Sequence, residues 1–281
     1  MTEIFHKSFT ILSESVEDSV REIDFFYPSG SLKIRGLLMI PVELHAPYPL
    51  LVFNHGGING IYPGLKFIML ELARDEGFIV FAPSYRGEDG SDGEIEIARG
   101  EVDDVLNGLE LLLEWGLVDR DRVYMVGSSH GALITLIAMA RDSKGLIGKG
   151  VFGYGIADIF QWLKYLEDMG MLDDERVALE SYPFNIDDAD EVRLRNGLEY
   201  VDKIKAPFLI IQGEDDNLVP SEQAYILKDA ADKAGIGGVK VAMIPHGGHG
   251  LLTKTETLAD GTKRKSKPCE EAWRIILDFL K

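Results

Sequence analysis

The chain has a single cysteine, Cys269, so it cannot form an internal disulfide bond. It has no stretch of about 20 apolar residues that could span a membrane. The first residues also lack the basic segment and apolar core of a signal peptide. From these absences we expect a soluble protein in the cytoplasm.

Basic residues are scarce: 29 Lys and Arg stand against 47 Asp and Glu, which gives a net charge of −18. Such a surface argues against nucleic acid or an anionic membrane as a partner. The 281 residues, 46% of them hydrophobic, are enough to bury the core of one domain. We therefore expect a single domain over residues 1–281, with a homo-oligomer left open.

Motifs for cofactors and metals are missing as well. No Gly-x-Gly-x-x-Gly joins a first strand to its helix, as dinucleotide binding requires. No Cys/His cluster has the spacing of metal ligands, and His246 with His249 is too small a set. We expect neither a cofactor nor a metal.

Residues 123–133 are the most informative stretch that is present. An apolar strand runs into Gly127-Ser128-Ser129-His130-Gly131, and an apolar helical run follows. This is the pattern of a nucleophile elbow, in which a serine stands on a tight, strained strand-to-helix turn. The residues two positions before and after this serine lie close to other backbone atoms, so a residue without a Cβ is needed there. This explains Gly127 and Gly131. The motif also arises by chance, but the strand before it and the helix after it favour Ser129 as a nucleophile.

Strands and helices alternate from residue 50 onward, which predicts a mostly parallel sheet of about eight strands with helices on both faces. Residues 156–203 interrupt this rhythm, and we expect a helical insertion that partly covers the sheet edge. Residues 1–20 are expected to form an arm or an edge helix, and residues 253–267 a polar excursion. The expected strands cover 22–27, 32–40, 50–54, 78–82, 123–126, 147–152, 207–212 and 239–244.

A serine nucleophile needs a base and a third group that orients the base. The loop after the last expected strand offers His246 and His249, and we favour His249 because Gly248 and Gly250 leave it free to turn inward. The loop after the 207–212 strand offers three acids, and composition alone does not choose among them. The remaining histidines and the three acids are His6, His45, His55, His130, Glu214, Asp215 and Asp216.

The 50–54 strand ends in His55-Gly56-Gly57. Glycines at this point let backbone N–H groups face a substrate oxygen without side-chain obstruction, as an oxyanion loop requires. A plain glycine turn would have the same sequence. We expect the N–H groups of Gly57 and His130 to form the oxyanion hole, with His55 bracing the turn.

These segments, with Gly213-Glu214-Asp215-Asp216-Asn217-Leu218-Val219-Pro220 and Gly248-His249-Gly250, resemble the α/β-hydrolase superfamily. More narrowly, they are similar to its prolyl-oligopeptidase-like and dienelactone-hydrolase-like branch of serine esterases. The resemblance spans about residues 20–280 and implies the α/β-hydrolase fold. It also implies Asp216 as the triad acid, in the chain order Ser129, Asp216, His249.

We interpret the protein as a serine hydrolase of carboxylic esters that works through an acyl-enzyme. Peptidases of the resembling branch usually have an aromatic residue and two glycines after the nucleophile, where this chain has His130, Gly131 and Ala132. They also carry a large N-terminal propeller, for which this chain has no room. Small-molecule esters are thus the expected substrates. An aminopeptidase or acylaminoacyl-peptidase-like enzyme is the alternative, and a non-catalytic ligand receptor on the same fold is the third hypothesis.

Overall fold

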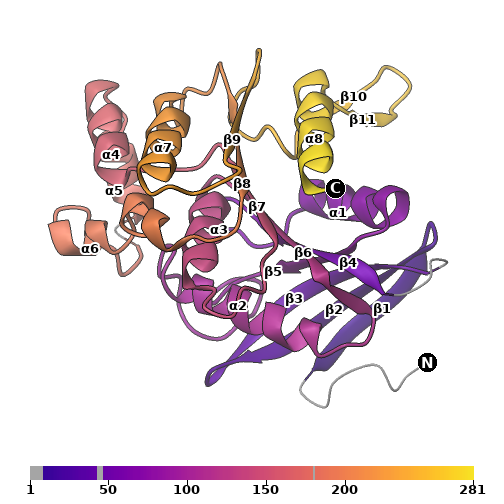
Figure 1. Cartoon of the computed structure of the whole chain (residues 1–281). Helices are drawn as coiled ribbons and strands as arrows, with labels where there is room; N and C mark the ends of the chain where they lie inside the picture. The colour runs from indigo at the N-terminus through magenta and orange to yellow at the C-terminus, as the bar shows by residue number, and fades with distance from the viewer. Residues whose placement is uncertain (1–8, 43–46, 180) are drawn as a thin grey trace.

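The computed structural model describes residues 9–42, 47–179 and 181–281. Within them, nine strands form one twisted sheet with helices on both sides (Figure 1). The strands are β1 (Thr10–Glu17), β2 (Val20–Ser29), β3 (Leu32–Pro41), β4 (Tyr48–Asn54), β5 (Ile79–Pro83), β6 (Val118–Ser128), β7 (Lys149–Gly153), β8 (Phe208–Gly213) and β9 (Lys240–Ile244).

The strand order is β1-β2-β3-β5-β4-β6-β7-β8-β9. Strands β1, β2, β3 and β5 pair antiparallel, whereas β5, β4, β6, β7, β8 and β9 pair parallel. The carboxyl ends of the parallel strands therefore meet at one edge of the sheet, where ligands bind in open α/β sheets. The prediction of a mostly parallel sheet is confirmed, with nine strands where about eight were expected.

Side-chain alternation along the buried strands explains the two helical layers. In β4, Leu50 and Val52 pack into one apolar cluster, while Leu51 and Phe53 pack into the other. The first cluster is covered by α2, α3 and α7, and the second by α1 and α8. These helices are α1 (Pro63–Glu76), α2 (Gly100–Leu113), α3 (His130–Arg141), α7 (Glu222–Lys233) and α8 (Lys267–Leu280).

The N-terminal segment differs from the expectation of an arm or an edge helix. Residues 10–17 form β1, which pairs with β2 through a register shift between Ile11 and Ser13. The cause is tertiary: β2 offers an open backbone edge, and this pairing satisfies groups that a short solvated helix would leave to water. Residues 1–8 lie outside the described residues.

The polar excursion over residues 253–267 contains a two-stranded hairpin, β10 (Thr255–Thr257) and β11 (Lys263–Lys265). An ion pair between Glu256 and Arg264 spans the two strands at 3.4 Å. Lys265 lies 3.1 Å from Glu71 of α1, which ties the hairpin to that helix. That this segment borders an acyl pocket or a subunit contact is a prediction.

The described part of residues 156–203 contains helices between β7 and β8, and its role as a cap stays a prediction. They are α4 (Ile159–Asp168), α5 (Leu172–Leu179) and α6 (Ala189–Arg193), followed by the short 3-10 turns η2 (Gly197–Glu199) and η3 (Val201–Lys203). Figure 1 shows α4, α5 and α6 together at one side of the sheet, next to α7. Over the described ranges, no helix has the length and apolar character needed to cross a lipid bilayer.

Candidate active site

The turn at Ser129 has the geometry expected of an elbow. Its backbone has φ 53° and ψ −123°, a strained combination for a residue with a side chain. A Cβ on Gly127 would lie 2.2 Å from the carbonyl oxygen of Gly131, and one on Gly131 would lie 2.1 Å from that of Asn54. Both glycines are therefore required by direct backbone contact. The hydroxyl of the preceding residue, Ser128, is buried.

The three side chains that the sequence selects meet at the carboxyl edge of the sheet. His249 Nε2 lies 3.0 Å from Ser129 Oγ, and His249 Nδ1 lies 2.9 Å from Asp216 Oδ2. A carboxylate only accepts hydrogen bonds, so Nδ1 carries the hydrogen and the lone pair of Nε2 faces the serine. The imidazole is thus oriented to take a proton from Ser129.

Asp216 is held in place by groups that the sequence did not single out. Its Oδ1 accepts hydrogen bonds from the N–H groups of Leu218 (3.0 Å) and Val219 (2.9 Å). The side-chain amide of Gln212, at the end of β8, donates to Oδ2 at 3.2 Å and to the Val219 carbonyl at 3.0 Å. These donors fix the position of the buried carboxyl group beside the imidazole.

Tyr154 borders the imidazole on another side. Its ring meets that of His249 edge-on, with 5.0 Å between the ring centroids. The residue is buried and has a left-handed backbone, with φ 37°. Burial raises the pKa of its hydroxyl, so the ring stays neutral and packs against the base.

The other acids and histidines of the sequence analysis lie elsewhere. His246 is 90% exposed on its side chain and is paired with exposed Asp215 at 3.4 Å, which leaves His249 as the inward-facing member of the loop. Glu214 is exposed. His6 and His45 lie outside the described residues.

The loop His55-Gly56-Gly57 packs directly against the elbow. A Cβ on Gly56 would lie 2.8 Å from the carbonyl oxygen of Ser128 and 3.0 Å from Ser129 Cβ. Gly57 has φ +71°, which favours glycine. The ring of His130 reaches back to this loop, with Nδ1 3.2 Å from the Gly57 carbonyl oxygen. The two residues expected to form the oxyanion hole are therefore neighbours.

His130 is held as a neutral imidazole. Burial lowers its pKa, and the negative charge of Glu101 opposes the shift without cancelling it. The Gly57 carbonyl only accepts, so Nδ1 carries the hydrogen, while Nε2 is buried. A neutral ring beside the elbow adds no positive charge that would compete with the base.

This shift makes stability depend on pH. The unfolded chain protonates His130 near its ordinary pKa of about 6.5, whereas the folded chain protonates it only at lower pH. The free energy of unfolding should therefore fall as the pH drops through about 6.5, by at most about 1.4 kcal/mol per pH unit from this group. Urea unfolding at pH 7.5, 6.5 and 5.5 should show a shallower decline for His130→Asn than for wild type. Parallel declines would contradict the prediction.

An apolar cluster joins the helical insertion to the site loops. Trp162 and Leu166 of α4 pack with Val219, three residues after Asp216, and Ile58, next to Gly57, borders the same cluster. Trp162 Nε1 also donates to the Leu218 carbonyl at 2.9 Å. The insertion thus bears directly on the loop that carries the acid.

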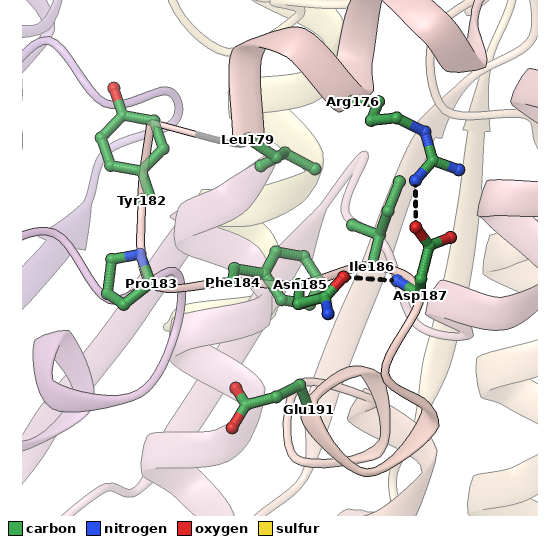
Figure 2. A pocket seen from close by; sticks show the side chains of 9 residues that line it. All are labelled: Arg176, Leu179, Tyr182, Pro183, Phe184, Asn185, Ile186, Asp187 and Glu191. Atoms are coloured by element: carbon green, nitrogen blue, oxygen red, sulfur yellow. Dashed lines mark hydrogen bonds and ion pairs between the residues drawn. The ribbon is translucent and has the colours of Figure 1, made fainter.

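The insertion also holds a cavity of about 360 Å³, within the range of small-molecule pockets. Figure 2 shows Tyr182 and Pro183 on one side of it and the Arg176–Asp187 ion pair on the other. None of the three triad candidates is among its lining residues. The described residues that line it are Arg176, Leu179, Tyr182, Pro183, Phe184, Asn185, Ile186, Asp187 and Glu191.

In residues 9–42, 47–179 and 181–281, no group of three His, Cys, Asp or Glu side chains is placed to hold an ion.

Comparison with known proteins identifies the family. The sequence pattern of the prolyl oligopeptidase family matches residues 65–266, which contain all three triad candidates. The chain belongs to this family. The α/β-hydrolase resemblance inferred from the motifs is thereby confirmed.

Three members or neighbours of the prolyl oligopeptidase family show the range of similarity. An uncharacterized peptidase of Bacillus subtilis, YtmA, is 28% identical over 76% of this chain and 81% of its own length. Acylamino-acid-releasing enzyme 1 of rice (Oryza sativa subsp. japonica) is 26% identical over 73% of this chain and 28% of its own length. The solved acylaminoacyl peptidase of Pyrococcus horikoshii superposes with a TM-score of 0.71 at 24% identity, over 93% of this chain and 41% of that chain. This chain thus spans most of YtmA but less than half of the other two.

Proposed function

We propose that this member of the prolyl oligopeptidase family is a serine peptidase that releases an acylated amino acid from the N-terminus of short peptides. The observation that carries the proposal is the hydrogen-bonded series Ser129–His249–Asp216 in a chain of this family. The peptidase was the alternative in the sequence analysis, and the relatives support it better than the ester reading. One of them, YtmA, is named a peptidase, and this chain covers 81% of its length.

The proposed reaction runs in two steps. Ser129 Oγ attacks the scissile carbonyl while His249 Nε2 takes its proton, and Asp216 stabilises the imidazolium. The N–H groups of Gly57 and His130 hold the oxyanion of the tetrahedral intermediate. His249 then gives the proton to the leaving amine, and a water molecule hydrolyses the acyl-enzyme by the same route.

The surroundings of the site support an acylated rather than a free N-terminus. Ile58 and Val219, which flank the oxyanion loop and the acid loop, belong to one apolar cluster. Burying a free ammonium group against such side chains would carry a desolvation cost, whereas a neutral acyl group would not. The name of the rice relative, an acylamino-acid-releasing enzyme, supports the same choice.

Carboxylic esters are the second candidate, because residue 130 is His. Peptidases of the prolyl-oligopeptidase-like branch usually carry an aromatic residue at this position. An ester also needs less help at the leaving group than an amide does. Both substrates pass through the same acyl-enzyme, so the difference lies in the preference and not in the residues used.

The test compares three substrates built on alanine: acetyl-alanine p-nitroanilide, alanine p-nitroanilide with a free amine, and the matching acetyl-alanine ester. We expect turnover of the acetylated anilide with a kcat/KM at least about tenfold above that of the free amine, a difference of about 1.4 kcal/mol. Hydrolysis of the ester without either anilide would replace the peptidase proposal by the esterase. A preference for the free amine would replace it by an aminopeptidase.

Three further statements stay predictions. We propose that the protein is located in the cytoplasm. We also propose that its partners are small molecules rather than nucleic acid or a membrane. Whether it forms a homo-oligomer is left open. Cell fractionation and light scattering of the purified protein measure the first and the last.

A further inference from the structure

Three consecutive carbonyl groups of the oxyanion loop each face a ring that can donate a hydrogen bond. The Tyr85 hydroxyl lies 3.3 Å from the His55 carbonyl oxygen. His55 Nδ1 lies 3.2 Å from the Gly56 carbonyl oxygen, and His130 Nδ1 lies 3.2 Å from that of Gly57. Three separate side chains therefore hold the loop through its carbonyl groups.

The second of these contacts sets the direction of the expected oxyanion donor. In a trans peptide the C=O and the N–H point in opposite directions. The carbonyl of Gly56 and the N–H of Gly57 belong to the same peptide unit. A hydrogen bond from His55 to that carbonyl consequently fixes the N–H of Gly57 on the opposite side, away from the ring.

The His55 ring is itself fixed by two partners. It stacks on Tyr85, with 4.3 Å between the ring centroids, and its Nε2 lies 3.2 Å from Glu88 Oε2. Both side chains of the His55–Glu88 pair are buried. The two atoms are at ion-pair distance, although their directions do not meet hydrogen-bond geometry here. Burial, and next the charge of Glu88, raises the pKa of Tyr85, which keeps its hydroxyl a donor.

The chemistry of this pair determines where the ring carries its hydrogens. The Gly56 carbonyl only accepts, so Nδ1 must be protonated to bond it. A carboxylate also only accepts, so a hydrogen bond between Nε2 and Glu88 requires a hydrogen on one of these two groups. Without an acceptor or donor at position 88, the neutral ring could place its single hydrogen on Nε2, and Nδ1 would then repel the Gly56 carbonyl.

We propose that Glu88 is a positioning residue for the oxyanion loop: through His55 it holds the Gly56–Gly57 peptide so that the Gly57 N–H faces the reacting carbonyl. This rests on the proposed function only in that Ser129 is the nucleophile. It does not depend on which acyl group or leaving group the protein prefers. Glu88 touches no reacting atom and acts by way of the ring.

The experiment measures the rate at which a fluorophosphonate probe labels Ser129, together with kcat and KM for p-nitrophenyl butyrate. The phosphonyl oxygen occupies the place of the substrate oxyanion, so labelling reports the oxyanion hole without knowledge of the natural substrate. We expect Glu88→Leu to lower both the labelling rate and kcat by about 10- to 100-fold, below the roughly 100- to 1,000-fold loss of a whole donor. KM should change by less than about threefold, because ground-state binding is not affected.

Two matched variants separate positioning from general damage. Glu88→Gln offers an amide N–H to the lone pair of Nε2 and so keeps the hydrogen on Nδ1; it should recover most of the rate lost in Glu88→Leu. Glu94→Leu removes an exposed carboxylate from the same loop and should behave as wild type. Tyr85→Phe deletes one hydrogen bond without changing a charge and should lower kcat by about threefold to tenfold.

The outcomes are distinguishable. A folded Glu88→Leu protein with labelling and kcat within about threefold of wild type overturns the inference, as does a change in KM alone. If Glu88→Leu does not fold, Tyr85→Phe decides: an unchanged kcat overturns the inference and a lowered one supports it. Wild-type protein that labels but cleaves no anilide refutes only the peptidase proposal. Wild-type protein that does not label at all refutes the nucleophile and, with it, both proposals.

Discussion

Replacement of Ser129 by alanine is expected to lower kcat by about 10⁴- to 10⁶-fold, the loss seen when a serine nucleophile is removed from such a triad. The reason is that His249 Nε2 contacts the Ser129 hydroxyl at 3.0 Å, whereas the neighbouring Ser128 is buried. The measurement is hydrolysis of p-nitrophenyl butyrate and of acetyl-alanine p-nitroanilide at saturating concentrations. The variant should bind substrate and unfold at the same urea concentration as wild type.

Ser128→Ala is the matched control, because it deletes the adjacent hydroxyl from the same strand end. We expect its kcat to stay within about threefold of wild type, since this hydroxyl is absent from the proposed chemistry. A Ser129→Ala protein that keeps more than a tenth of the activity would refute the triad. Loss of activity in Ser128→Ala but not in Ser129→Ala would assign the nucleophile to Ser128. That result would also refute the triad.

Replacement of Arg195 by methionine is expected to destabilise the protein by about 3 kcal/mol, because removing a buried donor leaves its acceptors unsatisfied. The Arg195 side chain is fully buried, 4.3 Å above the Phe184 ring, and donates to Glu191 Oε2 at 2.6 Å. It also donates to the carbonyls of Glu96 (2.8 Å) and Pro183 (3.1 Å). Its loss would leave buried acceptors unsatisfied where the helical insertion meets the 96–99 loop.

Arg193→Met tests whether position or charge matters. Arg193 lies on α6, is 57% exposed on its side chain, and pairs with Asp190 at 3.1 Å. Such a surface pair contributes less than about 1 kcal/mol, so the variant should be close to wild type. Urea unfolding followed by tryptophan fluorescence reports both, because Trp162 lies within the insertion. Equal effects of the two substitutions would contradict the buried role of Arg195.

The alternating layers could be predicted from the sequence because buried strands carry long apolar runs. Residues 50–54 and 207–212 show this pattern, and both are central strands in the structure. β1 could not be predicted in the same way. Its side chains are all exposed, and it exists because β2 offers a free edge, which is a property of the assembled sheet.

The site residues likewise fall into those that could be predicted from the sequence and those that could not. Ser129, Asp216 and His249 stand in short motifs at strand ends, so their meeting follows from strand order. Tyr154, Glu88 and Arg195 act through contacts between segments far apart in the chain, and no local pattern marks them. Gln212 lies only four residues before Asp216, but nothing in the sequence marks its amide as a partner of that carboxylate. A buried charged residue in particular looks like any surface residue until its partners are known. The ester preference, inferred from the residues after Ser129, is the part that the relatives do not favour.

The strand order has a consequence for how activity is lost. The proposed nucleophile, Ser129, follows β6, which has β4 and β7 as neighbours, whereas the proposed base, His249, follows β9, the last strand of the sheet. β9 is half-exposed along most of its length and pairs with β8 alone. Elements with few buried contacts open first, at a small free-energy cost. Local opening of β9 would move the His249 imidazole away from Ser129 while β6 and its neighbours stay folded. Inactivation by heat or denaturant can therefore precede unfolding of the rest of the sheet.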